Sequence, residues 1–277
     1  MKKVVFLLAA FGFAGVLFAV PPLSEIAVDL KLDEISYVSG ERVRGIVDVR
    51  NMSPDKVSVG YLNSEDRLLV EVFRAKGGEQ LTRFTKTPIT AGFRVDANEG
   101  QKLEVFLGDH YDLREERRYL ARAVLVHGGM RYEGPLRSFD IVPGMSLTRA
   151  MQIFSNADGL SRQFDLVRWM RGDTEHLFLK ARDLGTSTRS WATFDLGSMM
   201  KITKPSVSIM PDGKVVVFHR FGPDHFVRSE FWSLPDALEF REHSLVRDPE
   251  TAGQARVQEL YKEKGVPAKS NPWWKFW

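Results

Sequence analysis

The chain of 277 residues contains no cysteine. This absence excludes a disulfide scaffold, thiol catalysis, thiolate metal ligands and attachment of a lipid to an N-terminal cysteine. Three catalytic motifs are also missing from the sequence, namely the serine nucleophile elbow, the phosphate-binding glycine loop and the zinc-protease helix motif. We therefore expect no cofactor and none of the active sites that these motifs mark.

Long apolar runs are confined to the N-terminus. Lys2 and Lys3 precede an uncharged apolar stretch over residues 4–20, and Pro21 follows it. This order is typical of a bacterial export signal. As a helix the stretch would be about 25 Å long, which is shorter than the hydrocarbon core of roughly 30 Å. A signal peptide over residues 1–20 is therefore favoured over an uncleaved N-terminal anchor, and either form predicts an exported, periplasmic or outer-envelope protein.

A large excess of one sign of charge is absent as well. The formal net charge is +3, and without Lys2 and Lys3 the remaining 37 basic residues face 36 acidic ones. Because nucleic-acid binding depends on basic residues concentrated along one surface, a near-neutral body gives it no support. Hydrophobic residues make up 43% and charged residues 27% of the chain, as in ordinary globular domains.

Period-two alternation of apolar residues runs through much of residues 24–145 and predicts β-strands. The clearest examples are residues 26–32 and 43–49, each of which would bury one face. Turns rich in glycine and asparagine separate the apolar runs. Five further strands are predicted at residues 67–75, 80–85, 101–107, 118–126 and 131–142. Seven strands in about 120 residues match the number in an immunoglobulin-like sandwich.

A tyrosine follows a charged corner in this region. Residues 114–118 read Arg-Glu-Glu-Arg-Arg, and Tyr119 then begins a predicted strand. This arrangement resembles the tyrosine corner of immunoglobulin-like domains, in which the hydroxyl bonds back to the corner. Ala121 stands where antibody domains have a cysteine, so the antibody class is excluded. Residues 47–53 and 138–144 add a resemblance to exported bacterial immunoglobulin-like domains. It covers residues 24–145 and implies a β-sandwich, a fold that serves adhesins, inhibitors, chaperones and enzyme appendages.

The composition changes after Pro143, and we predict a linker over residues 148–156. A second β domain is expected at residues 155–247. Within it, residues 167–194 and 207–231 share one plan of strand, turn, apolar strand, turn and aromatic strand. Each unit resembles part of a β-propeller blade, but two units are too few to close a propeller. The expected fold is therefore all-β, with an immunoglobulin-like sandwich followed by a small antiparallel sheet domain of two three-stranded, blade-like units.

The last region, residues 248–277, departs from the β pattern. Asp248 followed by proline, and Gly265 further along, predict a helix over residues 249–264. The extended tail beyond it could fold back onto a sheet of its own chain, dock in a groove of a partner protein or lie at a membrane surface. Its candidate interaction or membrane-contact residues are Trp273, Trp274, Lys275, Phe276 and Trp277.

Candidate metal ligands are few. His219, Asp224 and His225 lie close together in the sequence around a predicted hairpin, and zinc accepts both imidazole and carboxylate ligands. The alternative is that the two histidines are ordinary surface or cross-strand residues, because a metal site also needs convergent geometry.

The predicted export signal, the turn-rich β domains and the lack of catalytic motifs favour a non-catalytic protein of the cell envelope that binds a protein or a glycan. Two other functions stay open. One is inhibition of extracytoplasmic proteases by loops at one end of the sandwich. The other is metal-dependent catalysis by His219, Asp224 and His225.

Overall fold

A computed structural model describes residues 25–60, 65–154, 159–184 and 192–247 of the chain. Over these residues the fold is all-β, as predicted, and its helical element is the 3-10 turn η1 (Leu107–Asp109). The described part holds no helix that is long and apolar enough to cross a membrane. The predicted export signal, the predicted helix over residues 249–264 and the aromatic tail lie outside the described residues.

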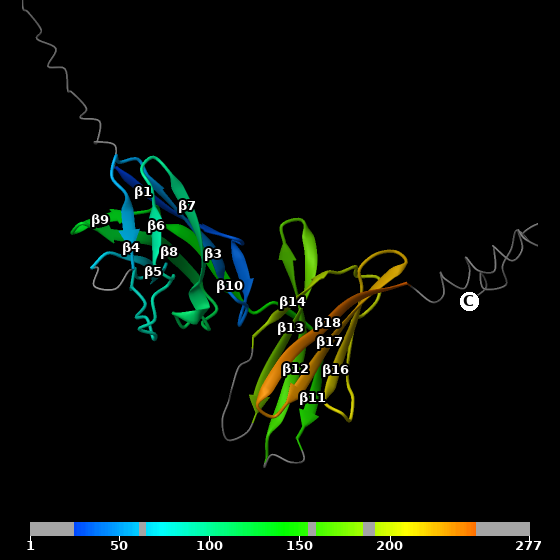
Figure 1. The fold of residues 1–277 in the computed structure, drawn as a ribbon. Coiled ribbons are helices and arrows are strands. Elements are labelled where there is room, and N and C mark those ends of the chain that lie inside the picture. Colours follow the sequence, from blue (N-terminus) through cyan, green and yellow to red (C-terminus); the bar gives the residue numbers. More distant parts are fainter. Residues whose placement is uncertain (1–24, 61–64, 155–158, 185–191, 248–277) are drawn as a thin grey trace, which may run out of the picture.

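The chain forms two β-rich halves, an N-terminal half over residues 25–142 and a C-terminal half over residues 145–247 (Figure 1). The N-terminal half contains a three-stranded sheet, a five-stranded sheet and a two-stranded sheet. The first has the order β1 (Ile26–Leu32), β3 (Arg44–Asn51), β7 (Gly100–Phe106). The second has the order β2 (Ser36–Val38), β10 (Arg137–Val142), β8 (Arg118–His127), β5 (Arg67–Arg74), with β9 (Met130–Glu133) also paired to β8. The third pairs β4 (Val57–Val59) with β6 (Phe93–Val95).

Alternating apolar residues of these sheets share one core. Val28 and Leu30 of β1 and Val47 of β3 are buried in the same cluster as Ala123 and Leu125 of β8. Since complete burial of a Val or Leu side chain contributes about 1.5–3 kcal/mol, this shared core is the main reason that the two larger sheets stay together.

The strands predicted at residues 26–32 and 43–49 are confirmed as β1 and β3. The strand predicted at residues 80–85 is wrong, because this segment makes one isolated bridge, Phe73 to Gln80, and no ladder. The strand predicted at residues 131–142 is two strands, β9 and β10, which are separated around Pro135. Proline has no N–H to donate to a ladder, so it interrupts the pairing.

Pro143 and Gly144 connect the two halves. Gly144 has a φ of 70°, and a Cβ atom at this position would lie 3.0 Å from Val167 Cγ2, so both the backbone conformation and the space favour glycine. The chain then enters β11 (Met145–Ile153) directly. A linker over residues 148–153 is therefore wrong, since these residues belong to β11 and pair with β12. The domain start at residue 155 lies outside the described residues and stays a prediction.

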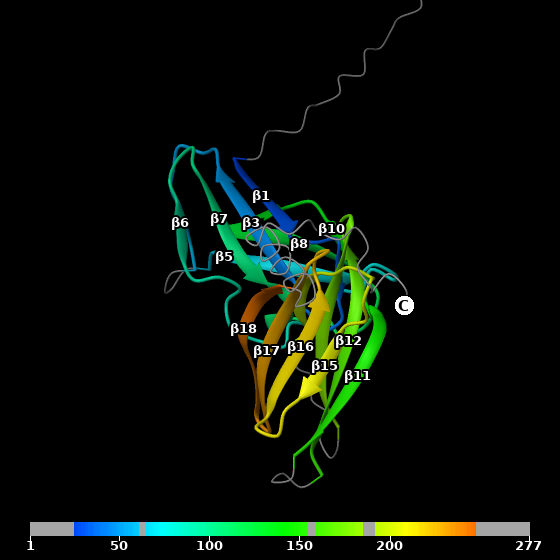
Figure 2. The same cartoon turned by 90° about the vertical axis from the view of Figure 1, so that its right-hand side faces the viewer.

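The C-terminal half consists of two four-stranded antiparallel sheets (Figure 2). One has the order β11, β12 (Ser161–Arg171), β13 (Thr174–Leu184), β14 (Phe194–Ser198). The other has the order β15 (Ser206–Ile209), β16 (Lys214–Arg220), β17 (His225–Leu234), β18 (Ala237–Arg247). The two repeated units thus have four strands each and not the predicted three, because β11 and β18 extend them.

The faces of β12 have different roles. Phe164 and Leu166 point into a core that they share with Val215, Val217 and Phe231 of the other sheet. The residues between and beside them point the other way, because side chains alternate along a strand. This outward face of β12 and β13 lies against the N-terminal half and carries the junction and the cleft described next.

Candidate functional site

The two halves meet at a buried junction. At the end of β12, Trp169 Nε1 donates a hydrogen bond to Ser36 Oγ at 2.9 Å, and Arg171 Nη1 donates to Ser36 O at 2.6 Å. Val38 of β2 packs in one buried cluster with Phe178 of β13. Both polar and apolar contacts therefore fix β2 of the N-terminal half on the outward face of the C-terminal half.

Arg171 is the central cation of this junction. It is buried, it forms an ion pair with Glu41, and its guanidinium lies 5.6 Å from the ring centroid of Tyr37 and 5.2 Å from that of Phe178. Burial raises the pKa of Glu41, and the charge of Arg171 opposes that rise. The ion pair thus joins residues of the two halves in a site that is largely closed to water.

The loop after β2 is attached to the strand region before β14. Thr193 N donates to Gly40 O at 2.9 Å, and Thr193 Oγ1 donates to Ser39 O at 2.8 Å. Glu41 and Thr193 also form a parallel bridge. This loop is consequently a fixed wall for the space beside the junction.

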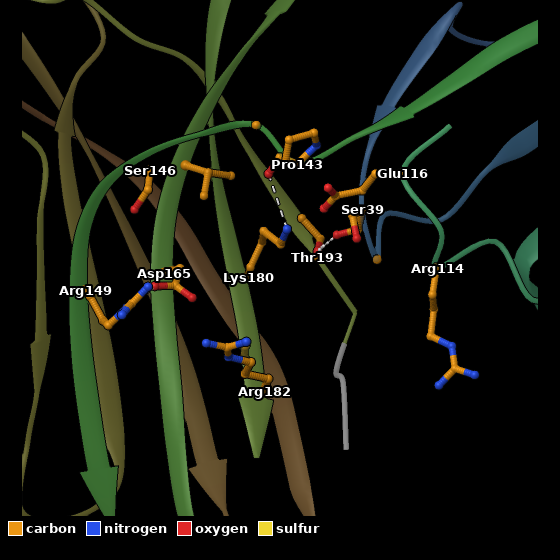
Figure 3. Close-up of a pocket in the computed structure, with 14 residues that line it drawn as sticks. Ser39, Arg114, Glu116, Pro143, Ser146, Arg149, Asp165, Lys180, Arg182 and Thr193 are labelled. Carbon is orange, nitrogen blue, oxygen red and sulfur yellow. Dashed lines mark hydrogen bonds and ion pairs between the residues drawn. The ribbon is translucent and has the colours of Figure 1, made fainter. Parts of the chain in front are cut away.

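A cleft of about 430 Å³ opens beside the junction (Figure 3). Its floor comes from the outward face of β11, β12 and β13, and its walls come from Ser39 and Gly40, from Pro143 and Gly144, and from the charged corner before β8. The charged residues that line it are Arg114, Glu116, Arg149, Asp165, Lys180 and Arg182. Four of these side chains are basic and two are acidic.

A row of charged residues crosses the floor of the cleft. In the strand register, Arg149 lies opposite Asp165, and Asp165 lies opposite Lys180. The Asp165 carboxylate accepts hydrogen bonds from Arg149 Nε at 2.6 Å and from Gln163 Nε2 at 2.5 Å. Since Asp165 is already held by these two donors, it does not form an ion pair with its other neighbour, Lys180.

Lys180 is a partly buried cation that lacks a carboxylate partner among the described residues. Its Nζ donates to the carbonyl oxygen of Pro143 at 3.2 Å. Burial lowers the pKa of Lys180, and the more distant charges of Glu116 and Asp165 raise it only in part. The fold therefore holds an ammonium group in the cleft at an electrostatic cost.

The other charged residues of the cleft differ in the hydrogen bonds and ion pairs that they already form. Arg114 is engaged, because its Nε and Nη2 donate to the carboxylate of Asp112 at 2.7 and 2.6 Å. Arg182 Nη2 makes one long contact of 3.3 Å to Gln163 Oε1. Glu116 forms no ion pair with any described residue. Lys180, Arg182 and Glu116 are thus the charged groups that a ligand could engage.

Hydroxyl groups also line the cleft. Ser39 and Ser146 bring hydroxyl groups to the lining, but histidine does not occur among the described residues that line the cleft. A hydroxyl nucleophile needs an adjacent base, which is most often an imidazole.

The residues predicted as candidate metal ligands are not gathered into a site. His219 is buried in β16 and its Nε2 donates to Ser198 O at 3.2 Å, whereas His225 at the start of β17 contacts Asp224, with 2.7 Å between Nδ1 and Oδ1. Across the described ranges, no three or more His, Asp or Glu side chains are grouped so that they could hold a metal ion.

Tyr119, the predicted corner residue, is buried at the start of β8. Its hydroxyl donates to Glu115 O at 3.0 Å, four residues earlier in the chain. Its ring stacks on that of Phe139, with 5.5 Å between the centroids. Tyr119 therefore links the charged corner, which also supplies Arg114 and Glu116 to the cleft, to the core of the N-terminal half. Trp273, Trp274, Lys275, Phe276 and Trp277 lie outside the described residues.

The cleft residues were not identified in the sequence analysis. Lys180 and Arg182 do alternate with apolar residues in β13, which shows that both lie on one face of a strand. The sequence does not show that this face lies against the N-terminal half, and without that knowledge the two basic residues look like ordinary solvated side chains.

Comparisons with known proteins identify no family for the chain. No protein-family model matches it, and no curated protein does. One solved structure that aligns with it is Spo0M, a sporulation control protein from Bacillus subtilis, with a TM-score of 0.30 and 10% sequence identity over 87% of this chain and 98% of that chain.

Proposed function

We propose that this protein is a non-catalytic binding protein of the cell envelope and that the cleft beside the junction binds an anionic group of its ligand. The observation that carries this proposal is the position of Lys180, whose ammonium is partly buried and has no counter-ion among the described residues. A charge that destabilises the folded protein is readily explained if it forms an ion pair with a carboxylate or phosphate of a ligand. Arg182 adds a second donor beside it.

The proposal includes an immunoglobulin-like fold for the N-terminal half. Its support is the pair of larger sheets around one core and the hydrogen bond from Tyr119 to Glu115 O at the corner before β8. This bond has the direction expected of a tyrosine corner. Such a sandwich is a common scaffold for binding surfaces outside the cytoplasm.

Export to the envelope is the second part of the proposal. Its support is the order of Lys2, Lys3 and the apolar stretch over residues 4–20, which suits recognition by a secretion pathway. Fractionation of cells that express the full chain, compared with a chain that lacks residues 1–20, tests this part. We expect the full chain in the envelope fraction and the shortened chain in the cytoplasm. The same cytoplasmic distribution for both would contradict export.

Titration calorimetry with citrate and with inorganic phosphate tests the cleft. The variant Lys180→Met removes the ammonium and keeps most of the volume, and Lys102→Met on the exposed surface of β7 is the charge-matched control. Because a hydrogen bond to a charged group contributes about 1.5–3 kcal/mol, we expect Lys180→Met to bind roughly 10-fold to 100-fold more weakly. Lys102→Met should bind like the wild type.

Stability measurements on the same variants separate binding from folding. Because burial disfavours the charged form of Lys180, Lys180→Met should be at least as stable as the wild type in urea denaturation. Wild-type affinity in Lys180→Met, or no binding of either anion to the wild-type protein at millimolar concentration, would overturn the proposed site.

A further inference from the structure

A second hollow adjoins the cleft. It has a volume of about 450 Å³, and it shares Gly40 and Arg114 with the cleft. Its other lining residues include Phe84, Tyr111 and Leu113. Gly40 and Arg114 therefore lie at the border between the two spaces.

The two spaces differ in chemistry. The cleft has the unpaired charges of Lys180 and Glu116. The hollow instead offers Phe84, a residue that is 62% exposed, beside the buried Tyr111 and Leu113. An apolar group that covered the Phe84 ring would remove apolar surface of both molecules from water. A ligand that fits both spaces therefore has an anionic group and, next to it, a bulky apolar group.

Arg114 stands at the border between the two spaces with its charge already neutralised. Both of its hydrogen bonds to the carboxylate of Asp112 are short, at 2.7 and 2.6 Å. A paired guanidinium does not require another anion, so the ligand segment that crosses the border can be uncharged.

The cleft itself presents charges of opposite sign from the two halves of the protein. Lys180 comes from β13 of the C-terminal half, and Glu116 comes from the corner before β8 of the N-terminal half. Neither forms an ion pair with a described residue. A ligand that satisfies both must bring a negative acceptor to Lys180 and an N–H donor to Glu116.

An extended peptide meets these requirements with adjacent groups. Its acidic side chain supplies the acceptor, its backbone N–H supplies the donor, and a neighbouring side chain supplies the apolar group. We propose that the cleft and the hollow together bind an extended peptide in which an acidic residue lies beside Lys180 and Glu116 and a nearby aromatic residue lies against Phe84. This inference rests on the proposed function and adds the class of partner, a protein segment.

Short blocked peptides test the inference. The probes are acetyl-Glu-Phe-Gly-amide and acetyl-Glu-Gly-Phe-amide, each compared with a peptide that has Gln in place of Glu and with one that has Ala in place of Phe. We expect the full-chain protein to bind at least one Glu- and Phe-containing peptide about tenfold more tightly than either substituted form. Phosphatidylglycerol vesicles and citrate are run beside the peptides.

Two protein variants assign each group of the peptide to its space. Phe84→Ala should abolish the preference for Phe over Ala in the peptide and keep the preference for Glu over Gln. Lys180→Met should abolish the preference for Glu over Gln and keep the preference for Phe over Ala. Phe221→Ala, which alters an exposed ring in the turn after β16, is the matched control and should keep both preferences.

Each alternative outcome has a distinct meaning. If citrate binds and Lys180→Met abolishes that binding while all the peptides fail to bind, the peptide inference is wrong and the proposed anion site stands. The peptide inference is also wrong if the protein binds the vesicles but does not discriminate among the peptides. If neither citrate nor inorganic phosphate nor any peptide binds the wild-type protein, the proposed function and the inference are both overturned.

Discussion

Arg162 and Asp183 form an ion pair inside the C-terminal half, with 2.6 Å between Nε and Oδ1 and side-chain exposures of 0% and 4%. Arg162 Nη1 also donates to the carbonyl oxygens of Leu234 and Ala237, at 2.8 and 2.9 Å. These bonds join β12 and β13 to the turn between β17 and β18. A buried guanidinium is tolerated here because its donors have acceptors, and the two sheets are thereby fixed at one end.

Replacement of Arg162 by leucine should be strongly destabilising. The substitution leaves Asp183 buried without its cation, and breaking a buried pair in this way costs about 3–5 kcal/mol. Arg42→Leu is the matched control, since Arg42 pairs with Asp109 on the surface and such pairs contribute at most about 1 kcal/mol. Urea denaturation of both variants measures the difference. A loss in Arg162→Leu that is no larger than in Arg42→Leu would contradict the structural role of the buried pair.

The stability of the junction between the halves should depend on the ion pair between Arg171 and Glu41. Arg171→Met should leave the partly buried Glu41 without its cation and should cost up to about 3 kcal/mol at neutral pH. Because the bonds of Arg171 join the halves, we expect calorimetry to show one main unfolding transition for the wild type and two separate transitions for the variant. Arg94→Met, at an exposed pair with Asp96, is the control. A single unshifted transition in Arg171→Met would show that the halves are coupled by other contacts.

Much of the strand content could be predicted because one face of each strand is buried in a core. Residues 26–32 alternate between buried apolar and more exposed positions, and this alternation is visible in the sequence. The strands β2, β4 and β6 have three residues each, which is too short for a periodic signal. β11 was mistaken for a linker because Met145, Met151 and Ile153 are exposed apolar residues at the edge of a sheet. Its strand conformation follows from pairing with β12, which is a non-local interaction.

The candidate site could not be predicted for a related reason. Lys180 reaches Pro143 O, and the cleft is completed by Arg114 and Glu116 from one corner and by Thr193 from a third segment of the chain. Their proximity follows from the way β2 lies on the outward face of β12 and β13, which no local pattern specifies. In contrast, His219 and His225 are close in sequence, but one is buried and bonded to Ser198 O while the other contacts Asp224. Proximity along the chain was therefore a poor guide to a shared site.

Loss of the hydrogen bond from Tyr119 to Glu115 O should lower the stability of the protein moderately. Tyr119→Phe removes the hydroxyl that donates to Glu115 O at 3.0 Å and keeps the ring stacked on Phe139. A hydrogen bond of this type contributes about 1 kcal/mol to folding. Tyr132→Phe, at a partly buried tyrosine of β9, is the matched control. Denaturant titration should show a loss of about 1 kcal/mol for Tyr119→Phe, and equal stability of the two variants would contradict a structural role for the corner.

Buried His219 makes the stability of the fold depend on pH in mildly acidic solution. Burial lowers the pKa of His219 from 6.5 to about 4, although the hydrogen bond to Ser198 O partly opposes this shift. Above pH 6.5 the imidazole is neutral in both the folded and the unfolded chain, so its contribution to stability is fully present. As the pH falls from 6.5 towards 4, the unfolded chain takes up a proton that the folded chain excludes. The free energy of unfolding should therefore fall by about 3 kcal/mol over this window, since one pKa unit corresponds to about 1.4 kcal/mol.

The variant His219→Gln isolates this effect from the titration of the carboxylates. Glutamine can still donate to Ser198 O, but it does not titrate, so its variant lacks the proton linkage. Between pH 7.5 and pH 4.5 we expect the wild type to lose about 2–3 kcal/mol more than His219→Gln in urea denaturation. His225→Gln, at a half-exposed histidine of β17, controls for the loss of a histidine and should follow the wild type. An identical pH dependence in the wild type and in His219→Gln would mean that His219 is accessible to protons in the folded chain. This result would contradict the burial of His219 in β16.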